Sequence, residues 1–383
     1  MQNSSTASDS APTAGISRRT RFQNLITQLS DLVHEYGPGA KLPTVLHMCD
    51  MTGVSVATLN SALSELEAQK LIVRKHGIGV YVSQTLHQKS VCLICDPSFF
   101  GVSGISPFWD LLVEQMRQRA EAGAEEFSFH LSMPSHGVAR SKVALHDGLI
   151  QEIETGCVQG IISVGLHEDV ADWIDAQGIP NVSFAGPARY YVMIDSEELV
   201  RLAVEQLAEK GCRKIAFWQS AAPRRETGHP RGPTPESEAF AEALQRYGLA
   251  FDSKLLRLGA DHLTGDTVIS MESTQEQGYR IATEVFSRGR KTLPDGIVIN
   301  DDLMTRGALS ALARIGVQAG RDVKIATHAN RGSTVLMGHE HEVSLVEIDP
   351  AEIVQAIFGM LETLMNGETP SENCVSILPR VRA

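Results

Sequence analysis

Polar and basic side chains in the first quarter of the chain have the types and spacing needed to grip nucleic acid. They are Lys41, Thr44, Ser55, Thr58, Asn60, Ser61, Lys75 and His76, and Gly77 beside them is a further candidate contact. Ammonium and hydroxyl groups donate hydrogen bonds to phosphate oxygens, and an asparagine amide pairs with a base edge in the major groove. Residues 17–86 hold seven Lys or Arg against five Asp or Glu, whereas the whole chain has a net charge of −12. This contrast directs nucleic acid to the first quarter of the chain.

A capped amphipathic helix is expected to carry Asn60 and Ser61. Ser55 follows a glycine turn and can cap this helix, and a phosphate contact by the same hydroxyl is compatible with capping. Four apolar residues then repeat with a helical period and form the inner face: Leu59, Ala62, Leu63 and Leu66. The outer face, where base edges would lie, is left to Val56, Ala57, Asn60, Ser61 and Ser64.

A glycine-tipped hairpin is expected to follow that helix. Residues 71–74 and 80–82 are short β-prone runs, and Gly77 and Gly79 permit a tight turn between them. Lys75 and His76, beside the tip, can meet phosphate or the minor groove. An earlier amphipathic helix, a turn, the capped helix and this hairpin together have the layout of a winged helix-turn-helix.

Several short motifs occur in a specific order in this segment. They are Pro38 to Thr44, Gly53-Val54-Ser55, Leu66-Glu67, Leu71-Ile72 and Gly77 to Val82. On these residues the segment 17–86 resembles the GntR family of bacterial repressors, which implies a winged helix-turn-helix DNA-binding domain. The arginine that this family has after the glycine turn is replaced by Val56, and a further basic position reads Asn60. Residues 1–16, polar and without an apolar core, are expected to form a disordered arm.

From Lys89 onward, short apolar runs alternate with helical patterns in two successive series. The expected strands of the first series are 91–95, 127–131, 160–164 and 181–184, and those of the second are 192–194, 214–218, 255–258, 296–300 and 323–326. Alternation of strand and helix implies parallel sheets, and two series imply two lobes. Ligands of such sheets bind beyond the carboxyl ends of the strands, so two facing lobes would form a cleft there.

An ordered set of motifs runs through this part of the chain: Ser106 to Trp109, Val158 to Ile162, Gln177 to Pro180, Gly211 to Phe217 and Pro294 to Asp301. On these residues it resembles the LacI/GalR effector-binding domain, which is similar to periplasmic sugar-binding proteins. The resemblance implies a side-by-side homodimer and two lobes joined by three crossings. We expect lobe 1 at 89–187 and 334–366, and lobe 2 at 188–333 and 367–383.

Only part of the effector contacts implied by this resemblance is present. Asn300 matches a hydroxyl ligand of the family, although it could instead cap the helix that follows. Three charged positions of the family fall on Ala185, Glu236 and Ala329. The candidate effector contacts are therefore Phe108, Trp109, Trp218, Gln219, Asn300 and His328, of which Trp109 and His328 fit a core position equally well.

Other chemistry finds little support in the sequence. Cys92 and Cys95 lie within one apolar run, where a spacing of three residues on a strand sends them to opposite faces and favours buried free thiols. His339-Glu340-His341 could hold a metal ion, but an exposed polar loop is the better interpretation. We find no nucleotide-binding or catalytic motif and expect no cofactor and no metal. No apolar run approaches the ~20 residues that span a bilayer, so we expect a cytoplasmic protein.

The sequence predicts an α/β protein with an N-terminal winged helix-turn-helix and a two-lobed periplasmic-binding-protein-like domain with parallel sheets. Its predicted function is transcriptional regulation, with repression as the expected sign. A homodimer would bind double-stranded operator DNA, and a small-molecule effector, a sugar or related metabolite, would control that binding. One alternative is a cytoplasmic ligand-binding protein with a decayed DNA-binding head. An α/β enzyme with an appended DNA-binding head is the weaker alternative.

Overall fold

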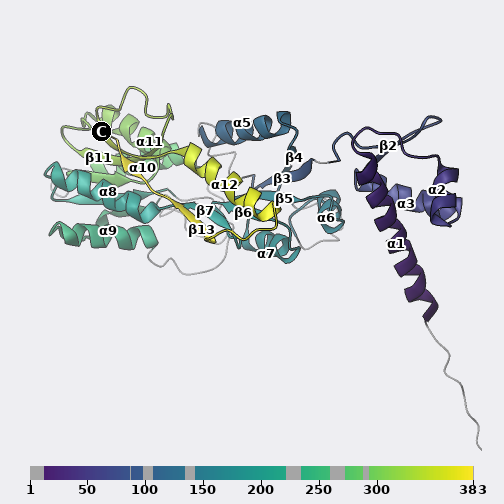
Figure 1. The fold of residues 1–383 in the computed structure, drawn as a ribbon. Coiled ribbons are helices and arrows are strands. Elements are labelled where there is room, and N and C mark those ends of the chain that lie inside the picture. Colours follow the sequence, from purple (N-terminus) through teal and green to yellow (C-terminus); the bar gives the residue numbers. More distant parts are fainter. Residues whose placement is uncertain are drawn as a thin grey trace, which may run out of the picture. The chain divides into compact units, whose positions relative to one another are not determined.

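A computed structural model describes residues 13–86, 88–97, 107–133, 143–220, 234–258, 272–287 and 293–382 (Figure 1). The chain divides into two compact units. One contains residues 1–91, 119–128 and 147–159, and the other contains the remaining segments. Of the expected disordered arm, residues 1–12 lie outside the described residues, and helix α1 already begins at Thr13.

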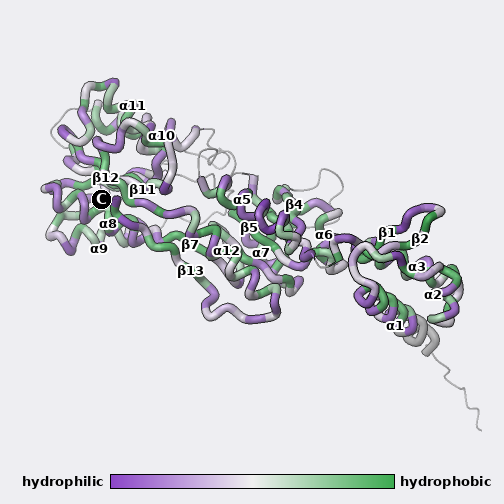
Figure 2. The backbone as a smooth tube through the Cα atoms, turned by 45° about the horizontal axis from the view of Figure 1, so that its top comes forward, coloured by the Kyte–Doolittle hydropathy of each residue, from purple (hydrophilic) through white to green (hydrophobic). Residues whose placement is uncertain are grey.

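The head of the chain is a winged helix. It contains α1 (Thr13–Tyr36), α2 (Val45–Thr52), α3 (Val56–Ala68), and the antiparallel strands β1 (Ile72–Lys75) and β2 (Gly79–Val82). The predicted inner face of α3 is buried, against apolar residues of α1, α2 and the hairpin. Hydrophobic and hydrophilic positions alternate along α1 in Figure 2, as they do on an amphipathic helix. The predicted order of elements is confirmed.

Two six-stranded sheets make up most of the remainder. The first has the order β13-β7-β6-β5-β3-β4 and the second β14-β12-β11-β10-β8-β9. The strands of the first sheet are β3 (Lys89–Cys95), β4 (Glu125–Leu131), β5 (Gly160–Val164), β6 (Asn181–Phe184), β7 (Tyr191–Ile194) and β13 (Cys374–Ile377). Those of the second are β8 (Ile215–Gln219), β9 (Leu256–Leu258), β10 (Gly296–Ile299), β11 (Lys324–Asn330), β12 (Val343–Ile348) and β14 (Arg380–Val381).

Helices connect these strands in the alternating manner of parallel sheets. They are α5 (Pro107–Glu121), α6 (Asp147–Glu154), α7 (Glu168–Ala176), α8 (Ser196–Glu209), α9 (Pro235–Arg246), α10 (Thr274–Ser287), α11 (Asp302–Ile315) and α12 (Pro350–Met365), with a short 3-10 turn at Ser253–Leu255. Figure 1 shows α8 and α9 on one face of the second sheet and α10 and α11 on the other. The α/β class is confirmed, because β8–β10, β10–β11, β5–β6 and β6–β7 all pair in parallel.

The crossings between the sheets lie later than the sequence predicts. β7 pairs with β6 and β13 and so belongs to the first sheet, whereas β12 pairs with β11 in the second. The chain therefore changes sheet after Ile194, Ile348 and Ile377, not near 187, 333 and 366. Short apolar runs show where strands form but carry no local sign of which strand they will pair with.

Two helices of the second lobe approach each other unusually closely at glycines. A Cβ atom at Gly278 of α10 would lie 1.9 Å from the carbonyl oxygen of Met304, and one at Gly307 of α11 would lie 1.8 Å from that of Gln275. No real Cβ atom tolerates such a distance, so only glycine permits this helix contact. By contrast, a Cβ at Gly359 of α12 would meet nothing within 4 Å.

Candidate nucleic-acid interface and effector site

The outer face of α3 presents a small, uncharged surface. Val56, Ala57, Asn60, Ser61 and Ser64 are all exposed, as the helical period predicts. Ser61 Oγ donates to the carbonyl of Ala57 at 3.1 Å and Ser64 Oγ to that of Asn60 at 2.9 Å. These hydroxyls satisfy part of their bonding locally, which leaves the exposed amide of Asn60 as the strongest base-reading group on the face.

The predicted cap residues do act as caps. Ser55 Oγ accepts from the backbone N–H of Thr58 at 3.2 Å and lies 2.9 Å from the Thr58 hydroxyl. Thr44 Oγ1 accepts from the N–H of His47 at 3.3 Å. A hydroxyl oxygen that accepts from an N–H still has its own O–H to donate. Capping by Ser55 and Thr44 is thus compatible with the predicted phosphate contacts.

An ion pair that the sequence does not reveal joins α3 to the β1–β2 hairpin, which is the wing of the winged helix. The Arg74 backbone N–H donates to Glu67 Oε1 at 3.0 Å and its Nε to Oε2 at 2.7 Å. Arg74 Nη2 also donates to Ser64 Oγ at 2.9 Å. The hydrogen bonds from Arg74 lower the pKa of the Glu67 carboxyl, first through the backbone N–H. Arg74 is therefore committed to α3, while Lys41, Lys75, His76 and Gly77 remain exposed.

Three predicted effector residues form a row across adjacent strands of the second sheet. In register, Ile299 lies beside Trp218 on one side and beside Thr327 on the other. The next residues along, Gln219, Asn300 and His328, therefore align where β8 and β10 end, with His328 two residues before the end of β11. Side chains in register point to the same face of a sheet. A polar row at this edge occupies the usual ligand position of parallel α/β sheets.

Two atoms of this row are buried without a partner. Asn300 Oδ1 and His328 Nε2 have no hydrogen-bond partner among the described residues. Because buried polar side chains are nearly always hydrogen-bonded, such orphan atoms point to an absent ligand or water. Gln219 differs, since its Oε1 accepts from the Thr234 hydroxyl at 3.3 Å.

Asp301, directly after Asn300, is a buried carboxyl with a shifted pKa. It caps α11, with Oδ1 accepting from the Met304 N–H at 2.7 Å. Asn300 therefore does not cap that helix, and its side chain is left for another role. Burial raises the pKa of Asp301 to about 6, against the opposing effects of the helix N–H and of His328. Burial lowers the pKa of His328, which keeps its imidazole neutral at pH 7.

Two of the three aromatic candidates, Phe108 and Trp218, are buried. Phe108 is 4% exposed, with its ring centroid 4.8 Å from that of Phe184. Trp109 is half-buried and meets Phe108 edge-on at 5.2 Å. Trp218 is 1% exposed and lies within the core of the second lobe. This burial favours a core role for Phe108 and Trp218, whereas Trp109 is only partly buried.

The positions that lack the family's charges have other roles here. Ala185 adopts a left-handed backbone with φ 57°, directly after β6. Glu236 accepts from the Ser196 hydroxyl at 3.0 Å, and Ala329 is buried. Ala185 and Ala329 carry no charge, and the Glu236 carboxylate is engaged by Ser196.

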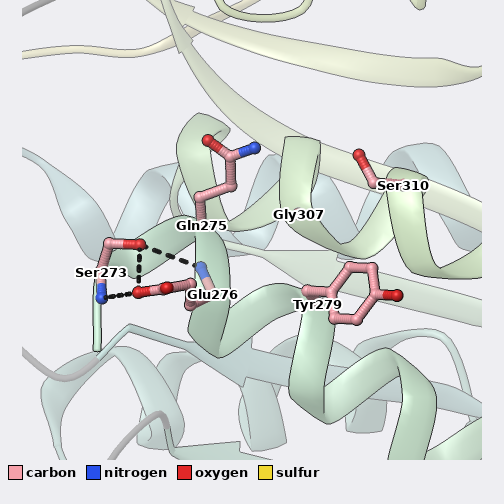
Figure 3. A pocket seen from close by; sticks show the side chains of 6 residues that line it. All are labelled: Ser273, Gln275, Glu276, Tyr279, Gly307 and Ser310. Carbon is pink, nitrogen blue, oxygen red and sulfur yellow. Dashed lines mark hydrogen bonds between the residues drawn. The ribbon is translucent and has the colours of Figure 1, made fainter.

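A separate hollow of about 330 Å³ lies on the second lobe between α10 and α11 (Figure 3). It is lined by Ser273, Gln275, Glu276, Tyr279, Gly307 and Ser310, none of which belongs to the polar row. Two of these residues are already satisfied, because Ser273 and Glu276 hydrogen-bond to each other at the start of α10.

Within the described part of the chain, no three His, Cys, Asp or Glu residues are placed to hold a metal ion. His339 Nδ1 lies 3.0 Å from Glu342 Oε2 in an exposed turn, and Cys92 and Cys95 are buried free thiols. Burial raises the pKa of Cys95 to about 12. No helix in the described ranges is long and apolar enough to cross a membrane.

Two family models match the chain. Residues 23–82 match bacterial regulatory proteins of the gntR family, and residues 204–383 match the periplasmic binding protein-like domain. The uncharacterized HTH-type transcriptional regulator YjiR of Escherichia coli (strain K12) is 36% identical over 74 residues, which is 19% of this chain and 16% of that protein. This chain thus spans about a sixth of the length of that curated relative.

Solved structures with the same fold cover most of the chain. Transcription regulator CcpA of Lactococcus lactis is 18% identical with a TM-score of 0.57, over 77% of this chain and 98% of that one. A regulatory protein of the LacI family from Chloroflexus aggregans is 18% identical with a TM-score of 0.58, over 76% and 96%. The transcriptional regulator CelR–cellobiose complex is 20% identical with a TM-score of 0.55, over 89% and 99%. At these identities the likeness establishes a shared fold.

Proposed function

We propose that this chain, in which a gntR-family winged helix is joined to a periplasmic-binding-protein-like domain, regulates transcription by binding DNA under the control of a small molecule. The observation that carries the proposal is the head, with α3 capped by Ser55, buried on its inner face and open on its outer one. Such a helix fits the major groove, and the hairpin beside it fits the adjacent backbone. The proposal gives the chain no enzymatic role and places it in the cytoplasm, where DNA is accessible.

We further propose that the effector is an uncharged, hydroxyl-rich molecule bound at the row of Gln219, Asn300 and His328. Asn300 Oδ1 has no donor among the described residues, and a ligand hydroxyl would supply one, while the neutral imidazole of His328 offers Nε2 to the same ligand. A charged ligand would find no opposite charge at Ala185 or Ala329. The structural neighbours include a complex with cellobiose and LacI-family regulators from Lactobacillus casei with bound sucrose and glucose.

Regulation of this kind needs two heads. A single head with a net charge of about +2 makes few phosphate contacts, and a homodimer doubles them. We propose that the dimer recognises a pseudo-palindrome with half-sites one or two helical turns apart and represses the genes beside it. Effector binding changes operator affinity only by the difference in effector affinity between the two forms, typically ~1–3 kcal/mol.

The test is selection of bound sequences from a random duplex library with the full chain, followed by footprinting of the recovered site. We expect a two-fold symmetric site whose protection depends on salt. A thermal-shift screen of sugars, sugar acids and nucleosides then identifies the effector, which must also change operator affinity. The DNA-binding function is refuted if the selection yields no preferred sequence and the chain binds no duplex at low salt.

The ligand-binding protein with a decayed head is the second candidate, favoured by one observation. Val56, at the position of the family's arginine, is 44% exposed at the start of α3 and offers no hydrogen bond to DNA. This candidate predicts a ligand-dependent rise in melting temperature together with no DNA binding. A regulator should show both the ligand-dependent rise and DNA binding, so the thermal-shift screen and the DNA selection together distinguish the two candidates.

A further inference from the structure

Two lysine ammonium groups lie over one tyrosine ring on the wing. Lys75 Nζ is 4.7 Å from the centroid of the Tyr81 ring, and Lys41 Nζ is 5.8 Å from it. At such distances the negative face of an aromatic ring attracts a cation. The three residues come from different segments, because Lys75 ends β1, Tyr81 lies within β2, and Lys41 precedes α2.

The backbone holds all three side chains on one face of the hairpin. Lys41 pairs with Tyr81 through an isolated antiparallel bridge, so the two lie directly opposite each other. Lys75 is the register partner of Gly79, which is two residues before Tyr81 and therefore on the same face. Gly79 also makes room, because a Cβ there would lie 2.8 Å from Lys41 Cε. The stem of Lys41 thus crosses the hairpin where a side chain is missing.

These two lysines keep uncompensated charge, unlike their neighbours. Arg74 is bound to Glu67, and Lys70 Nζ lies 3.6 Å from Glu126 Oε2. Within the described ranges, neither Lys41 nor Lys75 has a carboxylate within ion-pair distance. The ring brings two like charges together without neutralising them, which makes the pair a strong attractor for an anion.

We propose that Lys41, Tyr81 and Lys75 form a phosphate clamp for the DNA backbone, in which Tyr81 is the positioning residue. The inference rests on the proposed DNA-binding function. Each ammonium has three donors, so one side can face the ring while others reach phosphate oxygens. The ring restricts the motion of both long lysine side chains and holds their ammonium groups close together. The contact with phosphate is independent of the base sequence.

The experiment measures binding of the full chain to a random-sequence duplex of about three helical turns, by fluorescence anisotropy over a range of KCl concentrations. Lys41→Met and Lys75→Met should each flatten the plot of log affinity against log salt by about one unit. Tyr81→Leu removes no charge, yet should flatten the same slope and weaken binding by about threefold to tenfold. Tyr81→Phe keeps the ring and should keep both affinity and slope.

Lys70→Met is the matched control, since it removes a lysine that already has a carboxylate partner, and it should keep the wild-type slope. A wild-type slope for Tyr81→Leu, at an unchanged melting temperature, overturns the clamp. If Tyr81→Leu lowers the melting temperature, the test rests instead on the double variant Lys41→Met, Lys75→Met. Its slope of log affinity against log salt should be flatter than that of the wild type by about two units, and a change of only one unit overturns the clamp. Failure of the wild-type chain to bind any duplex at low salt instead overturns the DNA-binding function itself.

Discussion

The side chain of Asn300 lowers the free energy of unfolding of the unliganded protein. Within the part of the chain that the structure describes, its buried Oδ1 has no donor, and Asp301 already performs the capping that Asn300 could have performed. The resemblance to the LacI/GalR effector-binding domain indicates Asn300, and His328 is a further candidate from the sequence. That they align with Gln219 across three strands depends on the sheet register, which no local pattern encodes.

Replacing Asn300 by leucine should therefore separate stability from response. An unpaired buried acceptor costs about 1–3 kcal/mol, so Asn300→Leu should leave the unfolding free energy of the unliganded protein unchanged or raise it. The same variant should lose the thermal shift given by the effector. Asp301→Ala is the contrasting variant, because loss of the α11 cap should cost about 1 kcal/mol. Urea unfolding with and without effector measures both, and a preserved thermal shift in Asn300→Leu removes Asn300 from the site.

Asp301 should also give the protein a pH dependence of recognisable sign. Its folded pKa of about 6 lies above the ordinary value of about 3.9. Between these values the folded state binds more protons than the unfolded state, so this carboxyl contributes stability below pH ~4 that is lost as the pH rises to ~6. His328, with a lowered pKa, acts in the opposite direction.

The comparison with Asp301→Asn isolates the carboxyl. The unfolding free energy of the wild type minus that of the variant should fall as the pH is raised from about 4 to about 6 and stay constant above that. Urea unfolding followed by intrinsic fluorescence measures it. A difference that is flat over this range, or that rises, contradicts the raised pKa.

At the scale of elements, strands and helices were the readily predictable part. Buried parallel strands are continuous apolar runs, so β5 and β6 fall on the residues that the sequence indicates. What could not be predicted depends on distant partners: the sheet to which β7 belongs, the Arg74–Glu67 pair, and the Tyr81 ring between two lysines. Each joins residues that are separated along the chain by other elements or by a turn.

The glycine contact between α10 and α11 makes a prediction of its own. Gly307→Ala should destabilise the protein by about 1–3 kcal/mol, because the new methyl meets the rigid carbonyl of Gln275 and the helices must separate. Gly359→Ala, also within a helix but with open space at its Cβ, should stabilise it by about 0.5–1 kcal/mol. Thermal melts of the two variants test this pair, and equal effects would show that packing is not the cause.

At the scale of the whole molecule, one short C-terminal stretch supplies an edge strand to each of the two sheets. β13 pairs with β7 in the first sheet and β14 with β12 in the second. A chain stopped after residue 372 should lose both edge strands, and its sheet domain should be digested faster by protease than that of the full chain. The winged helix, whose core is drawn from its own helices and hairpin, should keep its resistance. Equal digestion of both parts in the shortened chain and the full chain would contradict this.

That arrangement has a consequence for the newly made protein. The winged helix is complete once Val82 has left the ribosome, whereas the first sheet must wait for Cys374–Ile377. At translation speeds of ~5–20 residues per second, the interval lasts roughly 15–60 s. Throughout it the nascent chain carries a finished head and an unfinished sensor. For the homodimer proposed above, a head that emerges before its partner has only half of the phosphate contacts, so it binds an operator weakly during this interval.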